Sequence, residues 1–527
     1  MFLTQSRKTK RFTLNANTSY ENDMKFIVTL LLACVFLFSS EESFAKHFEI
    51  RSENFIITGD LKQKDGENLL RDLELFRKNV FKILGVNGAP ELIPVQVYVT
   101  KNEKGMKAVT GTGGFGGMYT MTHNGPAFVL NGKAGFRRGD GARHIALHEY
   151  THHIVSTYTE LDYPRWYNEG FANYLATFEY KDATFRVGDV YNPYAYALKQ
   201  KSWMPMTVVI GTMDTYPFNI GDTSKIGQQT QAQFYAQTWL ATHYLRNEKN
   251  YEGKLTDYVQ RLNKGEQNIP AFKAAMGVTP EEFETELKSY FKKNKFNVTR
   301  YKTTDQDIPE PVTRALTDKE SELARLDSMR SFVFSPERKK TVIKAYQDYE
   351  EKYGQSAQTL AAQADLTAYL AQNKVDYVAA RDLINKALEL DPENIEANNI
   401  AALIIAHQYV RNMGGTKADV KLIRKYAAKV LRHNSQIPLA NYSYALSYKD
   451  NYQPTENALN AAGFALDYYR DQSFIGSNLG LASILANGGK YEEAMPPVQR
   501  ALNWSKDPGM RMSAQSLKKY IENESAR

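Results

Sequence analysis

Residues 139–155 read GDGARHIALHEYTHHIV, and this stretch decides how the rest of the chain is interpreted. His148 and His152 are four residues apart, so on a helix they project from one face, one turn apart, and can share a metal ion. Glu149 lies about 100 degrees further round the helix. It is close enough to reach a water on that ion without being a ligand. Because an ordinary pair of surface histidines would show the same spacing, the neighbouring sequence has to discriminate between the two interpretations.

A second segment, PRWYNEGFANYLA at residues 164–176, offers a third ligand in Glu169. A catalytic zinc site uses three protein ligands and leaves one position for water. Sixteen residues separate His152 from Glu169, which is enough to end one helix, turn and begin an antiparallel second helix. Gly170 and Ala172 would keep the contact between these two helices close. The two segments together therefore predict one metal site.

These two segments resemble the gluzincin metallopeptidases, the group that holds zinc with two histidines and a glutamate. The motif Asn-Glu-Gly-Phe-Ala is similar to their aminopeptidase branch, and bacterial members of the clan with tetratricopeptide tails resemble nearly the whole chain. The resemblance implies an α+β, thermolysin-like zincin catalytic domain. It also implies that His148, His152 and Glu169 bind Zn²⁺, and that Glu149 is the general base and later the proton donor.

Two departures from the aminopeptidases favour an endopeptidase. Those enzymes carry a Gly-x-Met-Glu-Asn stretch whose glutamate holds the free amine of the substrate. The counterpart here, residues 116–120, reads GGMYT and has no glutamate. The spacing between the metal ligands is also two residues shorter. We therefore expect internal cleavage of an extended peptide bound along the strand at residues 127–130.

We also predict a role or a position for four further side chains near these segments. Tyr235 is the candidate donor to the tetrahedral intermediate, which needs a donor besides the metal, although aromatic stripes are usually core. Asn173 shares a helix face with the glutamate ligand and is a candidate for orienting a ligand histidine from behind, with plain packing as the alternative. We expect His144 to pack beside the site or support it, and His153 to be exposed.

Residues 24–45 are typical of an export signal, with Met24 as the expected natural start. Met24 and Lys25 precede an apolar run at residues 26–38 that is short for a membrane span, and Ala45 ends a small-x-small cleavage site. We interpret residues 1–23 as an upstream extension and residues 24–45 as a signal peptide. The mature protein would then be periplasmic or secreted by a bacterium, without an integral membrane segment. A buried core helix and a lipoprotein modified at Cys34 are the alternatives.

The C-terminal part of the chain is self-similar. Related motifs begin at Ala387, Val430, Ala465 and Ala501, at intervals of 43, 35 and 36 residues. This resembles tetratricopeptide repeats, whose period is about 34 residues, with a generic helical bundle as the alternative. The predicted domains are a zinc peptidase-like domain at 46–300, a linker and bridging helix at 301–335, and an all-α repeat domain at 336–527.

These expectations combine into an exported zinc endopeptidase that acts on peptides or proteins, with the repeats recruiting a substrate or a protein partner. A scaffold protein with an inactive or structural zinc domain is the main alternative, and a zinc hydrolase that is not a peptidase is another. The net charge of +7 is scattered along the chain, without a dense basic block. Nucleic acid is therefore not an expected partner.

Overall fold

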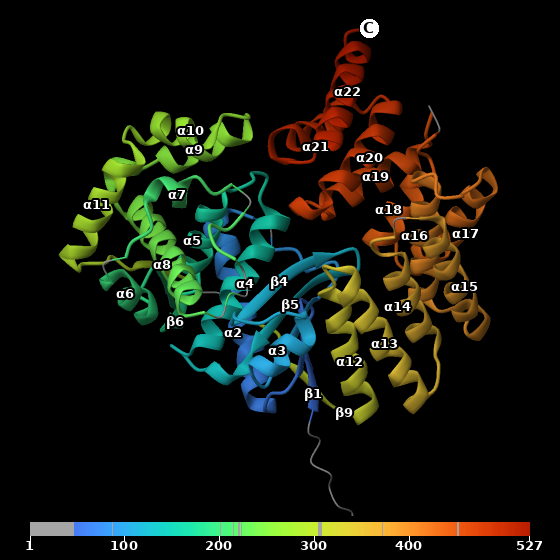
Figure 1. Ribbon diagram of the computed structural model, residues 1–527, viewed down its shortest axis with the longest axis horizontal. Helices are drawn as coiled ribbons and strands as arrows, with labels where there is room; N and C mark the ends of the chain where they lie inside the picture. The colour runs from blue at the N-terminus through green and yellow to red at the C-terminus, as the bar shows by residue number, and fades with distance from the viewer. Residues whose placement is uncertain are drawn as a thin grey trace, which may run out of the picture. The chain divides into compact units, whose positions relative to one another are not determined.

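The computed structural model describes residues 47–86, 88–200, 202–213, 215–219, 222, 224–303, 308–371, 373–450 and 453–527. The predicted upstream extension and signal peptide lie outside these residues. Residues 47–527 form one unit that mixes helices and strands (Figure 1). Among the helices of the described residues, none combines the length and the apolar character needed to cross a membrane.

A six-stranded sheet forms the centre of the N-terminal half (Figure 1). Its order is β4 (Gly117–Thr122), β5 (Gly125–Asn131), β3 (Val95–Thr100), β2 (Phe55–Gly59), β1 (His47–Arg51) and β9 (Val312–Leu316). Strands β2, β3 and β5 are parallel, whereas β1, β4 and β9 run antiparallel to their neighbours. The β4–β5 hairpin turns where Asn124 and Gly125 predicted a turn. Among the described strands, β4 has a partner on one side only and is therefore an edge strand.

Helices cover both faces of this sheet. On one face lie α2 (Gln63–Leu84) and α4 (Gly141–Tyr158), which pack with Val97 and Val99. On the other lie α3 (Glu103–Thr110) and α12 (Asp318–Ser331), which pack with Tyr98. The alternation of Val95, Val97 and Val99 with other residues in β3 is typical of a half-buried strand, but Tyr98 is buried as well. The reason is that α3 and α12, distant in sequence, close the second face.

The stretch at residues 301–335 is more than the predicted linker and bridging helix. Strand β8 (Thr299–Lys302) pairs with β7 (Thr184–Val187), which also pairs with β6 (Glu179–Lys181), in a second, three-stranded sheet. Strand β9 completes the edge of the main sheet against β1. Helix α12 lies in this stretch at Asp318–Ser331. The two strands were overlooked because edge strands with mostly exposed residues have the polar composition of a linker.

A further group of helices follows α4 in the sequence and lies on the other side of the main sheet from most of the C-terminal helices (Figure 1). Its members are α5 (Arg165–Leu175), α6 (Asn192–Lys199), α7 (Met206–Ile210), α8 (Lys225–Asn247), α9 (Lys254–Asn263), α10 (Asn268–Met276) and α11 (Pro280–Lys293). Helix α5 packs tightly on α8 at Gly170. A Cβ atom there would lie 2.3 Å from the carbonyl oxygen of Thr238, so no larger residue fits. Gly170 was expected to allow close contact with the metal helix, whereas its close neighbour is α8.

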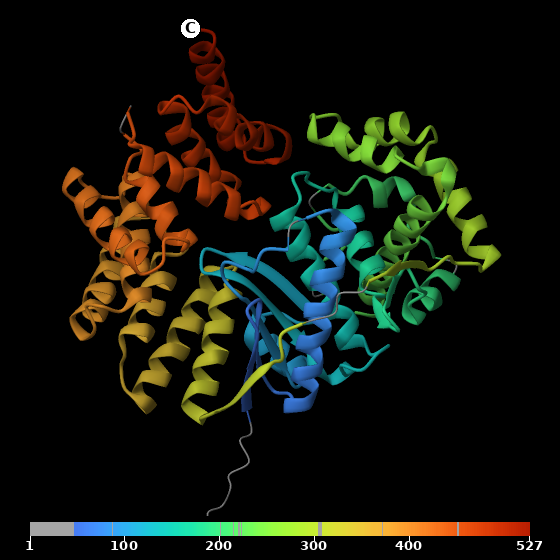
Figure 2. The same ribbon diagram turned by 180° about the vertical axis from the view of Figure 1, so that it is seen from behind.

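The C-terminal part is entirely helical among its described residues (Figure 2). Its helices are α13 (Pro336–Tyr353), α14 (Ala357–Ala368), α15 (Lys374–Leu390), α16 (Ile395–Val410), α17 (Lys417–His433), α18 (Pro438–Leu446), α19 (Glu456–Tyr468), α20 (Ile475–Asn487), α21 (Tyr491–Trp504) and α22 (Pro508–Ser525). The self-similar motifs lie on α15, α17, α19 and α21, each packed on the helix before it. Buried alanines such as Ala380, Ala427, Ala462 and Ala494 allow this close packing.

The helical part docks onto the sheet through the β4–β5 turn. The ring of His123 lies 4.9 Å from that of Phe474, 5.6 Å from Tyr469 and 5.7 Å from His407, measured between centroids. The Tyr469 hydroxyl donates to the carbonyl oxygen of His123 at 2.9 Å. Burial, together with the nearby charge of Arg411, lowers the pKa of His123 to about 4. The turn is therefore held by a neutral histidine in an aromatic pocket.

We expect this docking to weaken in acid. Between pH 6.5 and about 4 the unfolded chain protonates His123 while the folded chain does not, so stability falls as the pH drops through that window, by at most about 3 kcal/mol. Thermal unfolding at pH 7.5 and pH 4.5 should show a smaller difference in Tm for His123→Phe than for the wild type. Equal pH dependence in both proteins would contradict this prediction.

Candidate metal centre

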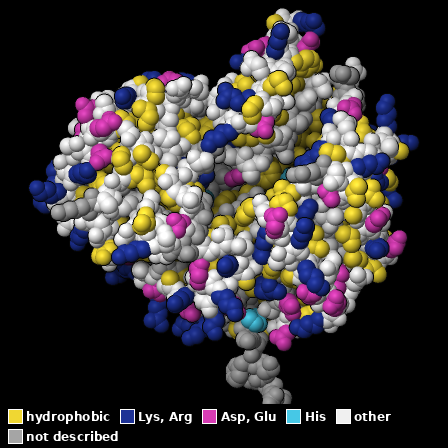
Figure 3. Space-filling view, in the orientation of Figure 1, with side chains coloured by type: hydrophobic (Ala, Val, Ile, Leu, Met, Phe, Trp, Pro, Cys, Tyr) yellow, Lys and Arg dark blue, Asp and Glu magenta, His cyan; other side chains and the backbone are white. Residues whose placement is uncertain are grey.

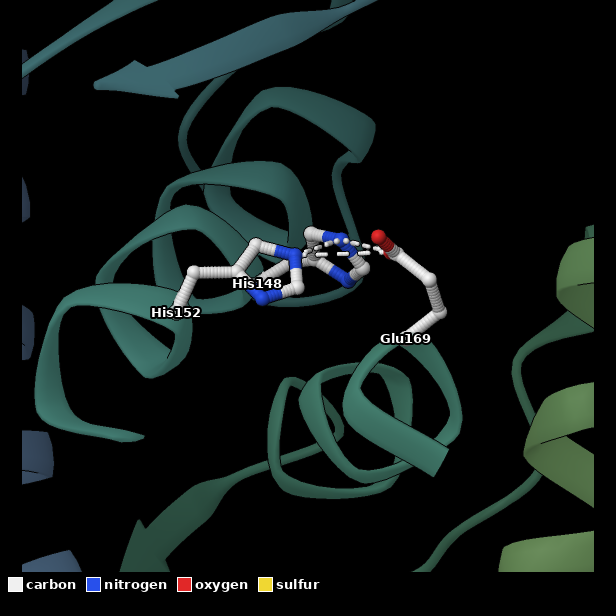
Figure 4. A group of neighbouring side chains, drawn as sticks. All are labelled: His148, His152 and Glu169. Atoms are coloured by element: carbon white, nitrogen blue, oxygen red, sulfur yellow. Dashed lines mark hydrogen bonds and ion pairs between the residues drawn. The ribbon is translucent and has the colours of Figure 1, made fainter. Parts of the chain in front are cut away.

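Two helices bring three potential ligand atoms to one point. His148 and His152 project from α4, with their Nε2 atoms 3.1 Å apart, and Glu169 projects from α5 (Figure 4). The Oε2 atom of Glu169 lies 3.1 Å from Nε2 of His148 and 3.4 Å from Nε2 of His152. The structure therefore brings the three predicted residues together. Their ligand atoms all lie within 4.8 Å of one another, close enough to hold one metal ion.

The triad fits a tetrahedral metal ion. Ligand atoms about 2.0 to 2.1 Å from a tetrahedral zinc are about 3.3 Å from one another, close to the three distances observed. The Oε2 atom of Glu169 is fully buried, and apart from the two histidine Nε2 atoms it has no hydrogen-bond partner among the described residues. Such a buried oxygen is costly unless a cation or a donor faces it. A metal ion held by His148, His152 and Glu169 would satisfy it.

Asn168 holds His152 in the tautomer that metal binding would require. The Nδ1–H of His152 donates to Oδ1 of Asn168 at 3.1 Å, which leaves the Nε2 lone pair facing the triad. From the sequence we predicted that Asn173 would orient a histidine of the triad. Instead, Oδ1 of Asn173 accepts from Tyr194 at 2.5 Å, and its amide faces the carbonyl oxygen of Tyr235. In the described structure Asn173 is thus a packing residue between α5 and α8.

Asn168→Ala should weaken metal binding about tenfold or more, because His152 loses the acceptor that fixes its ring. Competition against a chelator of known affinity would measure the change. Asn173→Ala is the matched control on the same helix and should leave the metal affinity near that of the wild type. An equal loss in both variants would point to a general effect on α5 and would contradict the assignment.

The other oxygen of Glu169 is anchored by residues that the sequence did not single out. Its Oε1 accepts from the Tyr216 hydroxyl at 2.6 Å and lies 3.6 Å from the Arg165 guanidinium. Burial alone would raise the pKa of Glu169, but the two histidines outweigh it and hold that pKa well below its usual range. Tyr216 lies in the connection between α7 and α8, outside any motif, so spacing alone could not have identified it.

Glu149 faces the edge strand β4. The backbone N–H of Tyr119 donates to its carboxylate, and burial raises the pKa of Glu149 to about 7. A cation at the neighbouring triad would lower this pKa. The peptide-binding strand predicted from sequence was β5, but β5 lies between β3 and β4 and has no free edge. The strand that borders the site and keeps one edge unpaired among the described strands is β4.

His153, predicted to be exposed, is 1 % exposed. Its Nε2 lies 3.1 Å from a carboxylate oxygen of Glu91, and its Nδ1 lies 3.1 Å from the Tyr119 hydroxyl. Burial would raise the pKa of Glu91, but His153 and Arg77 outweigh it and lower that pKa to about 2. Hydrogen bonds from the buried His153 to Tyr119 and Glu91 thus link α4 to β4. His144 packs as expected, with its ring stacked on that of Tyr191 at 3.9 Å.

Tyr235 on α8 lies beside the triad. Its ring is perpendicular to that of His148, with 6.1 Å between the centroids, and it lines the same cleft. Burial, followed by the charges of neighbouring groups including Glu169, raises the pKa of Tyr235 well above its usual value. The phenol therefore keeps its proton and can act as a hydrogen-bond donor at the site.

Comparisons of the chain with protein-family models, with curated proteins and with solved structures found no match in any of the three. The interpretation of the site therefore depends on its residues and geometry.

Proposed function

We propose that the protein is a zinc-dependent endopeptidase of the gluzincin type, exported from a bacterial cell, with a thermolysin-like catalytic part and tetratricopeptide-like helical repeats. The observation that carries the proposal is the convergence of His148, His152 and Glu169 beside an acidic residue, Glu149, at the edge of a sheet. A structural zinc site closes its fourth position with another protein ligand. Among the described residues, the cluster offers three ligands and faces an open cleft.

In this proposal the substrate lies along the outer edge of β4, where main-chain groups can pair with an extended peptide. Zinc bound at the triad would supply Lewis-acid polarisation of the scissile carbonyl and a lowered pKa for the attacking water. Glu149 takes the proton from that water and then delivers it to the departing amine. The Tyr235 hydroxyl donates a hydrogen bond to the negative oxygen that forms on the carbonyl carbon.

Digestion of unfolded casein by the purified, zinc-supplied protein tests the proposal. Mass spectrometry should show internal peptides whose formation a chelator abolishes and added zinc restores. Release of single amino acids from the N-terminus would indicate an aminopeptidase instead. Stable binding of a protein partner without cleavage would favour a scaffold.

Tyr235→Phe should lower kcat by about 10²- to 10³-fold with little change in KM, because the lost donor acts on charge that develops only in the transition state. The metal content should stay at the wild-type level. Tyr216→Phe is the comparison variant: it removes the hydroxyl that orients Glu169, so we expect weaker metal binding. Unchanged kcat in Tyr235→Phe would remove Tyr235 from the mechanism.

A further inference from the structure

The cleft over the triad has a volume of about 1130 Å³ and two walls of different origin. One wall comes from α4, β4 and the connection between α4 and α5. The opposite wall comes from α19, η3 (Gln472–Phe474) and α21 of the helical part. Figure 3 shows the surface hollowed between α9–α10 and α19–α21. The helical part therefore borders the candidate site directly. From the sequence we expected it to recruit a substrate or partner as a separate domain.

Hydrogen bonds and an ion pair join the second wall to the connection between α4 and α5 and to α9. The Arg500 guanidinium on α21 binds both carboxylate oxygens of Asp162, with Nε 2.6 Å from Oδ2. Asp162 lies in the connection between α4 and α5 and is itself bonded to Asn263 of α9. The Asn503 amide donates to the carbonyl oxygen of Asn263 at 2.6 Å. These contacts hold the helical wall across the cleft from β4.

The charges that line the cleft do not cancel. Three arginines line the cleft: Arg500 pairs with Asp162, Arg470 lies 2.9 Å from a carboxylate oxygen of Asp467, and Arg165 lies 3.6 Å from one of Glu169. The cleft is also lined by Glu160, Asp471 and Glu493. None of these three carboxylates has an ion-pair partner among the described residues. The two walls together therefore leave an excess of negative charge in the cleft.

Asp471 brings this charge close to the strand that would hold a peptide. One of its oxygens, Oδ1, accepts from the backbone N–H and the hydroxyl of Ser473, at 2.9 and 2.7 Å. Asp471 lines the same cleft as Tyr119, the β4 residue whose N–H bonds to Glu149, and burial together with the charge of Asp471 raises the pKa of Tyr119 well above its usual value. A side chain projecting from a peptide on β4 towards the helical wall would enter the part of the cleft that Asp471 lines.

We propose that the helical wall selects extended peptide segments that carry lysine or arginine close to the scissile bond, with Asp471, Glu493 and Glu160 receiving the cationic side chains. This inference rests on the proposed peptidase function and adds a substrate class to it. Carboxylates on both walls favour cations through the combined potential of a cleft with low-dielectric sides. Segments rich in aspartate or glutamate are repelled by the same field.

The test measures binding apart from catalysis. Fluorescein-labelled ten-residue peptides with one lysine, moved from position to position, are compared by anisotropy with the same peptides carrying norleucine. The zinc-supplied full chain with Glu149→Gln serves as the receptor. At the best position the lysine peptide should bind about fivefold tighter or more, and Asp471→Asn or Glu493→Gln should each lower this ratio roughly two- to fivefold. In Asp471→Asn the amide oxygen can still accept the two hydrogen bonds from Ser473, so the local structure should be kept.

Glu492→Gln is the matched control, since Glu492 is exposed on the same helix turn as Glu493 but does not line the cleft. It should keep the wild-type ratio, and 0.5 M NaCl should reduce that ratio. Equal affinity for lysine and norleucine peptides at every position, or a ratio unchanged by the cleft variants, would overturn the inference. If the wild-type protein, which keeps Glu149, bound lysine peptides selectively but did not cleave them, the peptidase function would be contradicted. The inference about lysine-selective binding would still hold.

Discussion

Replacing Glu149 with glutamine should lower kcat/KM for peptide hydrolysis by about 10³-fold or more while the metal content stays near one ion per chain. The amide has nearly the shape of the carboxylate, so the Tyr119 N–H keeps an acceptor and β4 keeps its position. It cannot accept the proton of the attacking water. General base catalysis of this kind contributes about 10²- to 10⁴-fold. Initial rates with an internally quenched peptide, together with metal analysis, measure both quantities.

Glu252→Gln is the matched control for this substitution, because Glu252 is exposed and lies outside the cleft. It should hydrolyse the peptide at the wild-type rate. Full activity in Glu149→Gln would show that another group moves the proton. Loss of the metal together with the activity would show instead that Glu149 supports the ion, and the roles in the site would have to be reassigned.

His148→Ala and Glu169→Ala should each reduce the bound metal from about one ion to less than about one tenth per chain. Each substitution leaves two protein ligands, too few for a stable catalytic zinc site. The loss has a second signature in stability. A metal that binds only the folded chain stabilises it by RT ln(1 + [metal]/Kd), so added zinc should raise Tm of the wild type and leave both variants nearly unchanged.

His433→Ala controls for general effects of histidine removal, since His433 is exposed at the end of α17, away from the triad. It should bind the metal like the wild type. Metal retained in both His148→Ala and Glu169→Ala would exclude the triad as the binding site. Wild-type protein that stays free of metal after purification in zinc-containing buffer would overturn the catalytic proposal itself.

The metal triad could be predicted because its geometry is mostly local. Two histidines four residues apart share one face of any helix, and Glu169 follows on the next helix after a short connection. The same local reasoning placed the strand β5, and the Asn124-Gly125 turn signal agrees with the β4–β5 hairpin. It failed for β9, because a polar edge strand takes its place only through pairing with β1, more than 260 residues earlier.

The sequence by itself determined which residues can share a metal, since this follows from spacing along the chain. The tertiary structure alone decided that β4, not β5, borders the site and that His153 is buried against Glu91. It also placed Asn168 on His152 and brought the helical wall to the cleft. These features depend on burial and partners contributed by distant segments, and no local pattern in the sequence records such contacts.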